Sequence, residues 1–123
     1  MELGNFSISL TVKDVRASST FYEKLGFRII EGDVEQHWVV MQNGPHSIGL
    51  FQGMFDRNML TFNPGWDEKG KPMEVFTDIR DLRRVIVDRG VETANEEQLG
   101  STGPGSFMVH DPDGNPILFD QHL

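Results

Sequence analysis

The side chains that most often carry chemistry are few and scattered in this sequence. There is no cysteine, which excludes a thiol nucleophile, a disulfide and a thiolate metal site. The four histidines fall in different predicted strands and turns, and no two of them have the spacing of a metal-binding pair. No serine stands in the turn of a nucleophile elbow, and no glycine string has the spacing of a phosphate-binding loop. The sequence therefore shows no self-evident catalytic motif.

Charge and length exclude several classes of partner. The chain has 123 residues, enough for one domain with a proper core, and a formal net charge of −8. An acidic surface argues against binding to nucleic acid or to anionic lipid. The first five residues lack the basic and apolar regions of a signal peptide, and no apolar run approaches the length of a membrane span. We expect a cytoplasmic protein that binds neither nucleic acid nor membrane.

The first half of the chain is predicted to have the order β-α-β-β-β. Residues 6–12 alternate between apolar and hydroxyl side chains, which is typical of a half-buried strand. Asp14 is a good N-cap for a helix over residues 15–25, and Gly26 stands where a helix commonly ends. Three further strands, separated by turn signals, are predicted at residues 27–31, 37–42 and 47–52.

The connection over residues 54–72 is rich in turn signals, and residues 59–62 form at most a short extended piece within it. A connection of this length usually carries a function or covers another part of the protein, although an exposed linker remains an alternative. The large aromatic side chains of Phe62 and Trp66 indicate that part of it packs.

After this linker the same order of elements is predicted again. A strand at residues 73–78 is followed by a helix at 79–89 and a short strand at 91–94. A hairpin ends the chain, with strands at residues 107–110 and 116–121 around a turn of proline, aspartate and glycine. We therefore predict a single domain over residues 1–123, built of modules 6–53 and 73–121. Each sheet alone closes its core poorly, so the two should pack together or against a second chain.

The duplicated unit and two motifs resemble a known family. The motifs are Val12-Lys13-Asp14, which enters a helix that ends Phe21-Tyr22-Glu23-Lys24-Leu25-Gly26-Phe27, and the turn Asp111-Pro112-Asp113-Gly114-Asn115-Pro116-Ile117. Together they resemble the vicinal-oxygen-chelate superfamily, which includes glyoxalase I, bleomycin-resistance proteins and extradiol dioxygenases. The resemblance implies an α+β fold of two βαβββ modules, with mixed curved sheets forming a cup, helices outside and a small-molecule site inside.

The resemblance also implies where a divalent ion would bind in metal-dependent members, with one ligand from each of four strands. The matching positions are Ser7, Leu50 (with Gln52 as the neighbouring alternative), Glu74 and Leu118. Of the four matched positions only Glu74 is a competent ligand, whereas catalytic zinc or iron sites need about three strong ligands. We expect no cofactor. A displaced divalent-metal site that uses Glu74, Asp120, Gln52 and His122 is the alternative.

The inner face of the implied cup mixes polar and apolar groups, which suits a small ligand held by a few hydrogen bonds. Its expected members are Ser7, Ser9, Thr11, Leu50, Gln52, Glu74, Phe76, Leu118 and Asp120. Glu74 would be desolvated there, which is the setting of a general acid or base, unless an arginine pairs with it. The aromatic residues Trp38, Phe62 and Trp66 would form a wall or lid, or else ordinary core.

The leading hypothesis is a metal-free, cup-shaped protein that binds a small organic molecule, as bleomycin-resistance proteins do, and forms a homodimer. The alternative is an enzyme, namely a lyase, isomerase or dioxygenase that uses non-standard ligands or Glu74 alone. A structural or regulatory role in which the sheet serves only for association is a third possibility.

Overall fold

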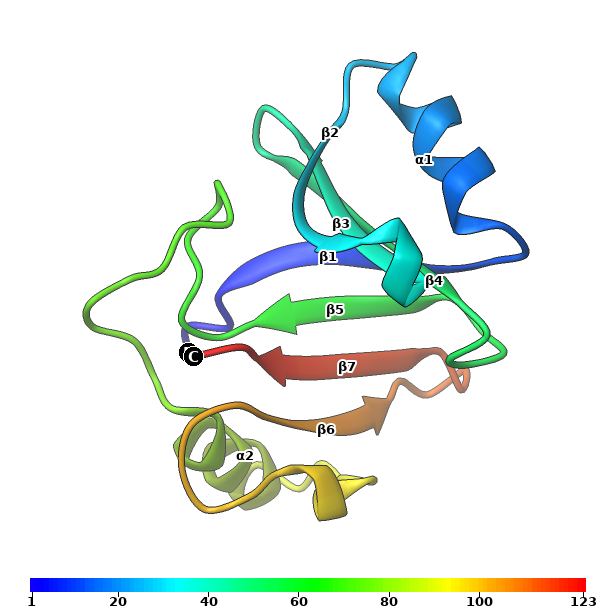
Figure 1. Ribbon diagram of the computed structural model, residues 1–123. Coiled ribbons are helices and arrows are strands. Elements are labelled where there is room, and N and C mark those ends of the chain that lie inside the picture. The colour runs from blue at the N-terminus through cyan, green and yellow to red at the C-terminus, as the bar shows by residue number, and fades with distance from the viewer. The chain divides into compact units, whose positions relative to one another are not determined.

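The computed structural model describes all residues 1–123, which divide into two compact units. The N-terminal unit is Ser7–Asn58, and the C-terminal unit joins Met1–Phe6 to Met59–Leu123. Both units follow one plan, in which a helix covers the apolar face of a mixed sheet (Figure 1). No helix of the structure is long and apolar enough to cross a membrane.

The sheet of the N-terminal unit has the strand order β2-β3-β4-β1. Strand β1 pairs in parallel with β4, while β3 pairs antiparallel with both β2 and β4. The elements in chain order are β1 (Asn5–Val12), α1 (Val15–Glu23), β2 (Arg28–Asp33), the short 3-10 helix η1 (Val34–Gln36), β3 (Trp38–Asn43) and β4 (His46–Gln52). This is the predicted β-α-β-β-β order, and the predicted helix and strands of the first half are confirmed.

Apolar side chains on one face of this sheet pack against α1. Val39, Met41 and Leu50 are fully buried there, together with Val15 from the first turn of the helix. The partly buried side chains around them are Leu10, Val12, Tyr22, Phe27, Val34 and Ile48. Since side chains alternate along a strand, the opposite face of β1 and β4 carries the small polar residues.

The sheet of the C-terminal unit has the order β5-β7-β6, with β5 parallel to β7 and β6 antiparallel to it. Its elements are β5 (Met59–Asn63), α2 (Ile79–Asp88), the 3-10 helix η2 (Glu96–Gln98), β6 (Gly105–His110) and β7 (Pro116–Gln121). Helix α2 covers the face that carries Phe107, Val109 and Phe119. The helix contributes Ile79, Leu82 and Ile86 to this core.

Three predictions for the second half need correction. The strand predicted at residues 73–78 is wrong, because the segment has no ladder partner and the Val75 side chain is 89% exposed. The first strand of the second half is instead β5, which lies within the predicted linker 54–72. The strand predicted at residues 91–94 is reduced to a single bridge between Ala94 and Met108. The predicted helix and the C-terminal hairpin are confirmed.

Both helices begin with the same pair of side-chain contacts. In α1, Asp14 accepts hydrogen bonds from the N–H groups of Arg16 and Ala17, and Gln52 Oε1 accepts one from Val15 N–H at 2.9 Å. The first N–H groups of a helix have no partner within the helix, so these contacts satisfy them.

In α2, Asp78 accepts a hydrogen bond from Arg80 N–H, and Gln121 Oε1 accepts one from Ile79 N–H at 2.8 Å. Gln121 is only 2% exposed, and its amide nitrogen donates to the carbonyl oxygens of Gly103 and Leu123. In each unit a glutamine at the end of the last strand therefore holds the first residue of the helix.

We expect the substitution Gln121→Met to lower the free energy of unfolding by about 3 kcal/mol, because it leaves the buried Ile79 N–H without an acceptor. Gln52 is only half-buried, so Gln52→Met should cost about 1 kcal/mol. Urea denaturation of the variants measures both effects, and Gln98→Met, at an exposed position, is the matched control. Equal stability of Gln121→Met and wild type would contradict the role given to this contact.

The turn between β6 and β7 is organised by the carboxylate of Asp111. Its Oδ1 accepts hydrogen bonds from the N–H groups of Asp113 and Asn115, both at 2.9 Å, and its Oδ2 accepts one from the Asn115 side-chain amide at 2.8 Å. The bond from the Asn115 side chain, followed by those from the backbone, lowers the pKa of Asp111 below its ordinary value.

A lowered pKa in the folded state means that ionised Asp111 stabilises the hairpin at pH values above its pKa in the unfolded chain. This contribution is lost as the pH falls through the lowered pKa of the folded state. Carboxyl-carbon NMR titration should place the midpoint of Asp111 below that of an unstructured aspartate. In Asp111→Asn, this part of the acid dependence of stability should disappear. An ordinary midpoint for Asp111 in the folded protein would contradict this account.

Candidate functional site

The sheet of the N-terminal unit presents a polar and aromatic face on the side opposite α1. Ladder partners share a face, so the pairs Ser9–Gly49 and Val40–Gly49 define one row across it. We call this surface the hydroxyl face; its members on β1, β3 and β4 are Ser7, Ser9, Thr11, Trp38, Val40, Gln42, Ser47, Gly49 and Phe51. None of these residues has an ionisable side chain. The edge strand β2 adds one carboxylate, that of Glu31, which pairs with Val40.

Aromatic rings gather at one end of the hydroxyl face. Trp38 and Phe51 are stacked, with ring centroids 6.1 Å apart and an angle of 4° between the planes. Phe55 lies 5.2 Å from Phe51, and its carbonyl oxygen accepts a hydrogen bond from the Thr11 hydroxyl at 2.9 Å. Gly49 is needed beneath this group, since a Cβ atom there would come within 2.5 Å of the Phe51 ring.

Hydroxyl groups occupy the other end of the same face. Ser7, Ser9 and Ser47 are buried, and Ser47 accepts a hydrogen bond from the Gln42 amide at 3.4 Å. Buried hydroxyls and a flat aromatic group on one surface suit a planar organic molecule with a few hydrogen-bonding atoms.

In the C-terminal unit, Leu118 and Asp120 share the face of β7 that is turned away from α2, as the alternation predicted. Leu118 pairs with Thr61 of β5 on one side and with Met108 of β6 on the other. Asp120 Oδ2 lies 3.1 Å from His122 Nε2. The buried Trp66 packs against this imidazole, with ring centroids 4.5 Å apart. Trp66 therefore supports an Asp–His pair.

Two residues predicted to face the cup lie on the other face of their strand. Leu50 is fully buried in the core beneath α1, because its ladder partner is Leu10 and both point towards the helix. Gln52 has the same orientation, and its side chain binds Val15 N–H. The prediction for β4 is therefore shifted by one residue. Gly49 and Phe51, and not Leu50 and Gln52, lie on the face turned away from α1.

Glu74 does not have the surroundings that were predicted for it. It lies on a bend outside any strand and its side chain is exposed, so the expectation of a desolvated carboxylate is wrong. Phe76 is half-buried, with its ring beside Gly65. Phe62 stacks on Phe119 within the core beneath α2 and forms no wall or lid.

The predicted orientation of Ser7, Ser9 and Thr11 is confirmed, and Trp38 joins them on the hydroxyl face. Sequence reasoning missed Ser47, Gly49, Phe51, Phe55 and Thr61. Alternation along β4 contained the signal for the first three, because the apolar Ile48 and Leu50 alternate with small or aromatic residues.

The residues at the matched positions do not fit a divalent ion. Ser7 offers a neutral hydroxyl, Leu50 lies in the core, Glu74 is exposed and Leu118 has no donor atom. No group of three His, Cys, Asp or Glu side chains lies close enough together to hold a metal ion. We therefore derive no metal-dependent step for this chain.

Two βαβ-type units, each with a mixed sheet covered by one helix, define the class of fold. The sequence matches the family model of the Glyoxalase/Bleomycin resistance protein/Dioxygenase superfamily over residues 6–119. The chain belongs to this family, which confirms both the resemblance and the α+β fold predicted from the sequence.

Solved structures show the same fold at low sequence identity. A glyoxalase/bleomycin resistance protein/dioxygenase superfamily member from Vibrio splendidus 12B01 is 17% identical, with a TM-score of 0.59 over 95% of this chain and 97% of that one. Homoprotocatechuate 2,3-dioxygenase from Arthrobacter globiformis is 18% identical, with a TM-score of 0.57. This chain is covered over 99% of its length but spans only 36% of that dioxygenase. Among curated proteins, none matches the chain.

Because the residues at the matched positions do not offer three strong ligands, purified protein should carry far less than one Zn, Ni, Mn or Fe ion per chain after dialysis. Elemental analysis by mass spectrometry measures this content. A millimolar excess of each ion should also leave the melting temperature unchanged, because an ion that binds the folded state raises it. A near-stoichiometric metal content would contradict the conclusion that these residues do not fit a divalent ion, and its loss in Glu74→Ala would identify Glu74 as a ligand.

Proposed function

We propose that this chain binds a small, planar organic molecule on the hydroxyl face of its N-terminal unit, without a divalent metal ion. The observation that carries the proposal is the composition of that face, where serine and threonine hydroxyls adjoin the stacked rings of Trp38 and Phe51. Membership of the family supports a small-molecule role, but one fold hosts many chemistries, so the site has to carry the argument.

The chemistry of the face defines the class of ligand. Stacked aromatic rings favour a flat molecule, since an offset ring adds about 1 kcal/mol beyond the burial of area. The hydroxyl groups offer neutral hydrogen bonds to carbonyl or hydroxyl atoms of a ligand. Glu31 at the edge of the sheet disfavours an anion. A neutral, hydroxylated aromatic compound meets all three conditions.

A thermal-shift screen of neutral hydroxylated aromatic compounds tests this proposal. A compound that binds should raise the melting temperature, and Phe51→Leu should weaken its affinity about tenfold, which corresponds to roughly 1.4 kcal/mol. Phe6→Leu, at an exposed aromatic position that does not belong to the hydroxyl face, is the matched control and should leave the affinity unchanged. A screen without hits, or hits that bind Phe51→Leu as tightly as wild type, would contradict the proposal.

The Asp120–His122 pair favours a second candidate function, namely proton transfer by a metal-independent lyase or isomerase. A carboxylate that accepts the Nε2 proton orients the imidazole, as in other His–carboxylate pairs. Under this alternative, His122→Asn would abolish turnover of a bound compound while leaving its affinity nearly unchanged. If the chain only binds the compound, no turnover is observed in wild type, and His122→Asn leaves the affinity unchanged.

A further inference from the structure

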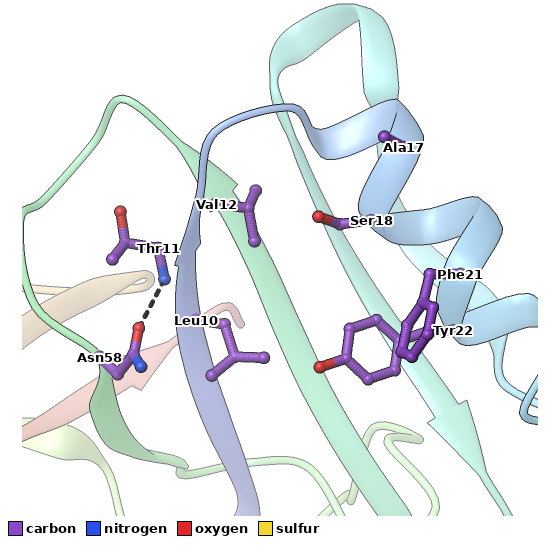
Figure 2. Close-up of a pocket in the computed structure, with 8 residues that line it drawn as sticks. All are labelled: Leu10, Thr11, Val12, Ala17, Ser18, Phe21, Tyr22 and Asn58. Atoms are coloured by element: carbon purple, nitrogen blue, oxygen red, sulfur yellow. Dashed lines mark hydrogen bonds between the residues drawn. The ribbon is translucent and has the colours of Figure 1, made fainter.

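A pocket of about 450 Å³ lies between α1 and β1 of the N-terminal unit, on the helix side of the sheet and at the edge of β1. Its volume falls within the range of small-molecule sites, about 300–1,000 Å³. Eight residues line it: Leu10, Thr11, Val12, Ala17, Ser18, Phe21, Tyr22 and Asn58 (Figure 2). Of these eight residues only Thr11 was predicted to bind a ligand, and it was expected to do so inside the cup.

The wall of the pocket is aromatic and held in position. Phe21 and Tyr22 meet edge to face, with ring centroids 5.1 Å apart and an angle of 86°. Tyr22 also packs edge to face on Phe27, with centroids 5.8 Å apart. Phe21 is 55% exposed, so a ligand that covers it would bury apolar surface that the folded chain leaves in water.

The polar groups of the pocket are few and uncharged. Figure 2 shows the hydroxyl of Ser18 pointing from α1 towards Val12, and that of Tyr22 pointing towards Leu10. The backbone N–H of Thr11 donates a hydrogen bond to Asn58 Oδ1 at 2.9 Å, which joins β1 to the far side of the pocket. No carboxylate, imidazole, ammonium or guanidinium group lines the pocket.

We infer that this pocket is a second ligand site, which binds a small neutral aromatic alcohol. The ring of such a ligand packs against Phe21, Tyr22 and Leu10, and its hydroxyl group bonds with the hydroxyls of Ser18 or Tyr22. A charged analogue binds poorly, because no side chain of the pocket can compensate its charge once it leaves water. The inference does not depend on the proposed function, since the pocket and the hydroxyl face share only Thr11.

Tyr22 is the only tyrosine of the chain, which makes a direct test possible. Protein labelled with 3-fluorotyrosine gives a single fluorine NMR resonance, and titration with benzyl alcohol should shift it saturably. Benzoate, which has a similar ring but a negative charge, should produce no saturable shift.

Two variants locate the binding. Ala17 lines the pocket from an exposed helix position, so Ala17→Leu should fill the space and weaken benzyl alcohol binding at least tenfold without unfolding α1. Thr20→Leu, at an exposed position of α1 that does not line the pocket, is the matched control and should bind as wild type does. Equal shifts in wild type and Ala17→Leu, or no saturable shift of Tyr22, would overturn the inference.

Protein labelled with 5-fluorotryptophan separates this site from the hydroxyl face. The chain has two tryptophans, and Trp38→Phe assigns their signals. Benzyl alcohol in the α1–β1 pocket should move the Tyr22 signal, and a movement of the Trp38 signal would report binding at the hydroxyl face separately. A shift of Trp38 with none at Tyr22 would overturn the pocket and still agree with the proposed function.

Discussion

The hydrogen bond from the first N–H of each helix to a glutamine of the last strand is the contact on which the rest of each unit depends. It ties the start of α1 to the end of β4, and the start of α2 to the end of β7, across 37 and 42 residues of sequence. With an aspartate N-cap beside it, the contact fixes where the helix starts and which strand it crosses. The same device occurs in both units, which is independent support for the duplication of one structural plan.

Strand register divides the N-terminal sheet into an apolar face that packs beneath α1 and a hydroxyl face that is turned away from the helix. In the N-terminal unit, Leu10 pairs with Leu50 and both point towards α1, so their neighbours Ser9 and Gly49 must point away from it. A shift of one residue would place every leucine on the polar face, so the apolar core fixes the register strongly. The prediction that Leu50 faces the cup is wrong by a shift of this kind. It followed from the family motif and not from the alternation of apolar and polar residues along β4, which places Leu50 beside Leu10 in the core.

Local sequence patterns predicted a helix or hairpin correctly where the segment itself carries capping or turn residues. Both helices were predictable from an aspartate N-cap, an apolar stripe and a glycine after the end; Gly26 and Gly90 have φ values of +93° and +87°. The hairpin was predictable from its turn. Where β5 forms, only a short extended piece at residues 59–62 was predicted, because these residues lie among turn signals and the partner strand β7 is more than fifty residues away. Residues 73–78 alternate as a strand does, but no neighbouring strand pairs with them. The absence of a pairing partner therefore outweighs the local preference for a strand.

The side chains of the candidate site follow the same division. Leu50 and Phe119 pack beneath a helix, although the sequence placed Leu50 on the inner face of the cup. Those on the hydroxyl face do not belong to the core beneath α1, and they range from hydroxyl and amide side chains to aromatic rings. A chain of this fold can therefore keep its apolar core and its register with different side chains on the opposite face of the sheet. The fold alone does not define a reaction, so the function has to be argued from the side chains that this particular chain places there.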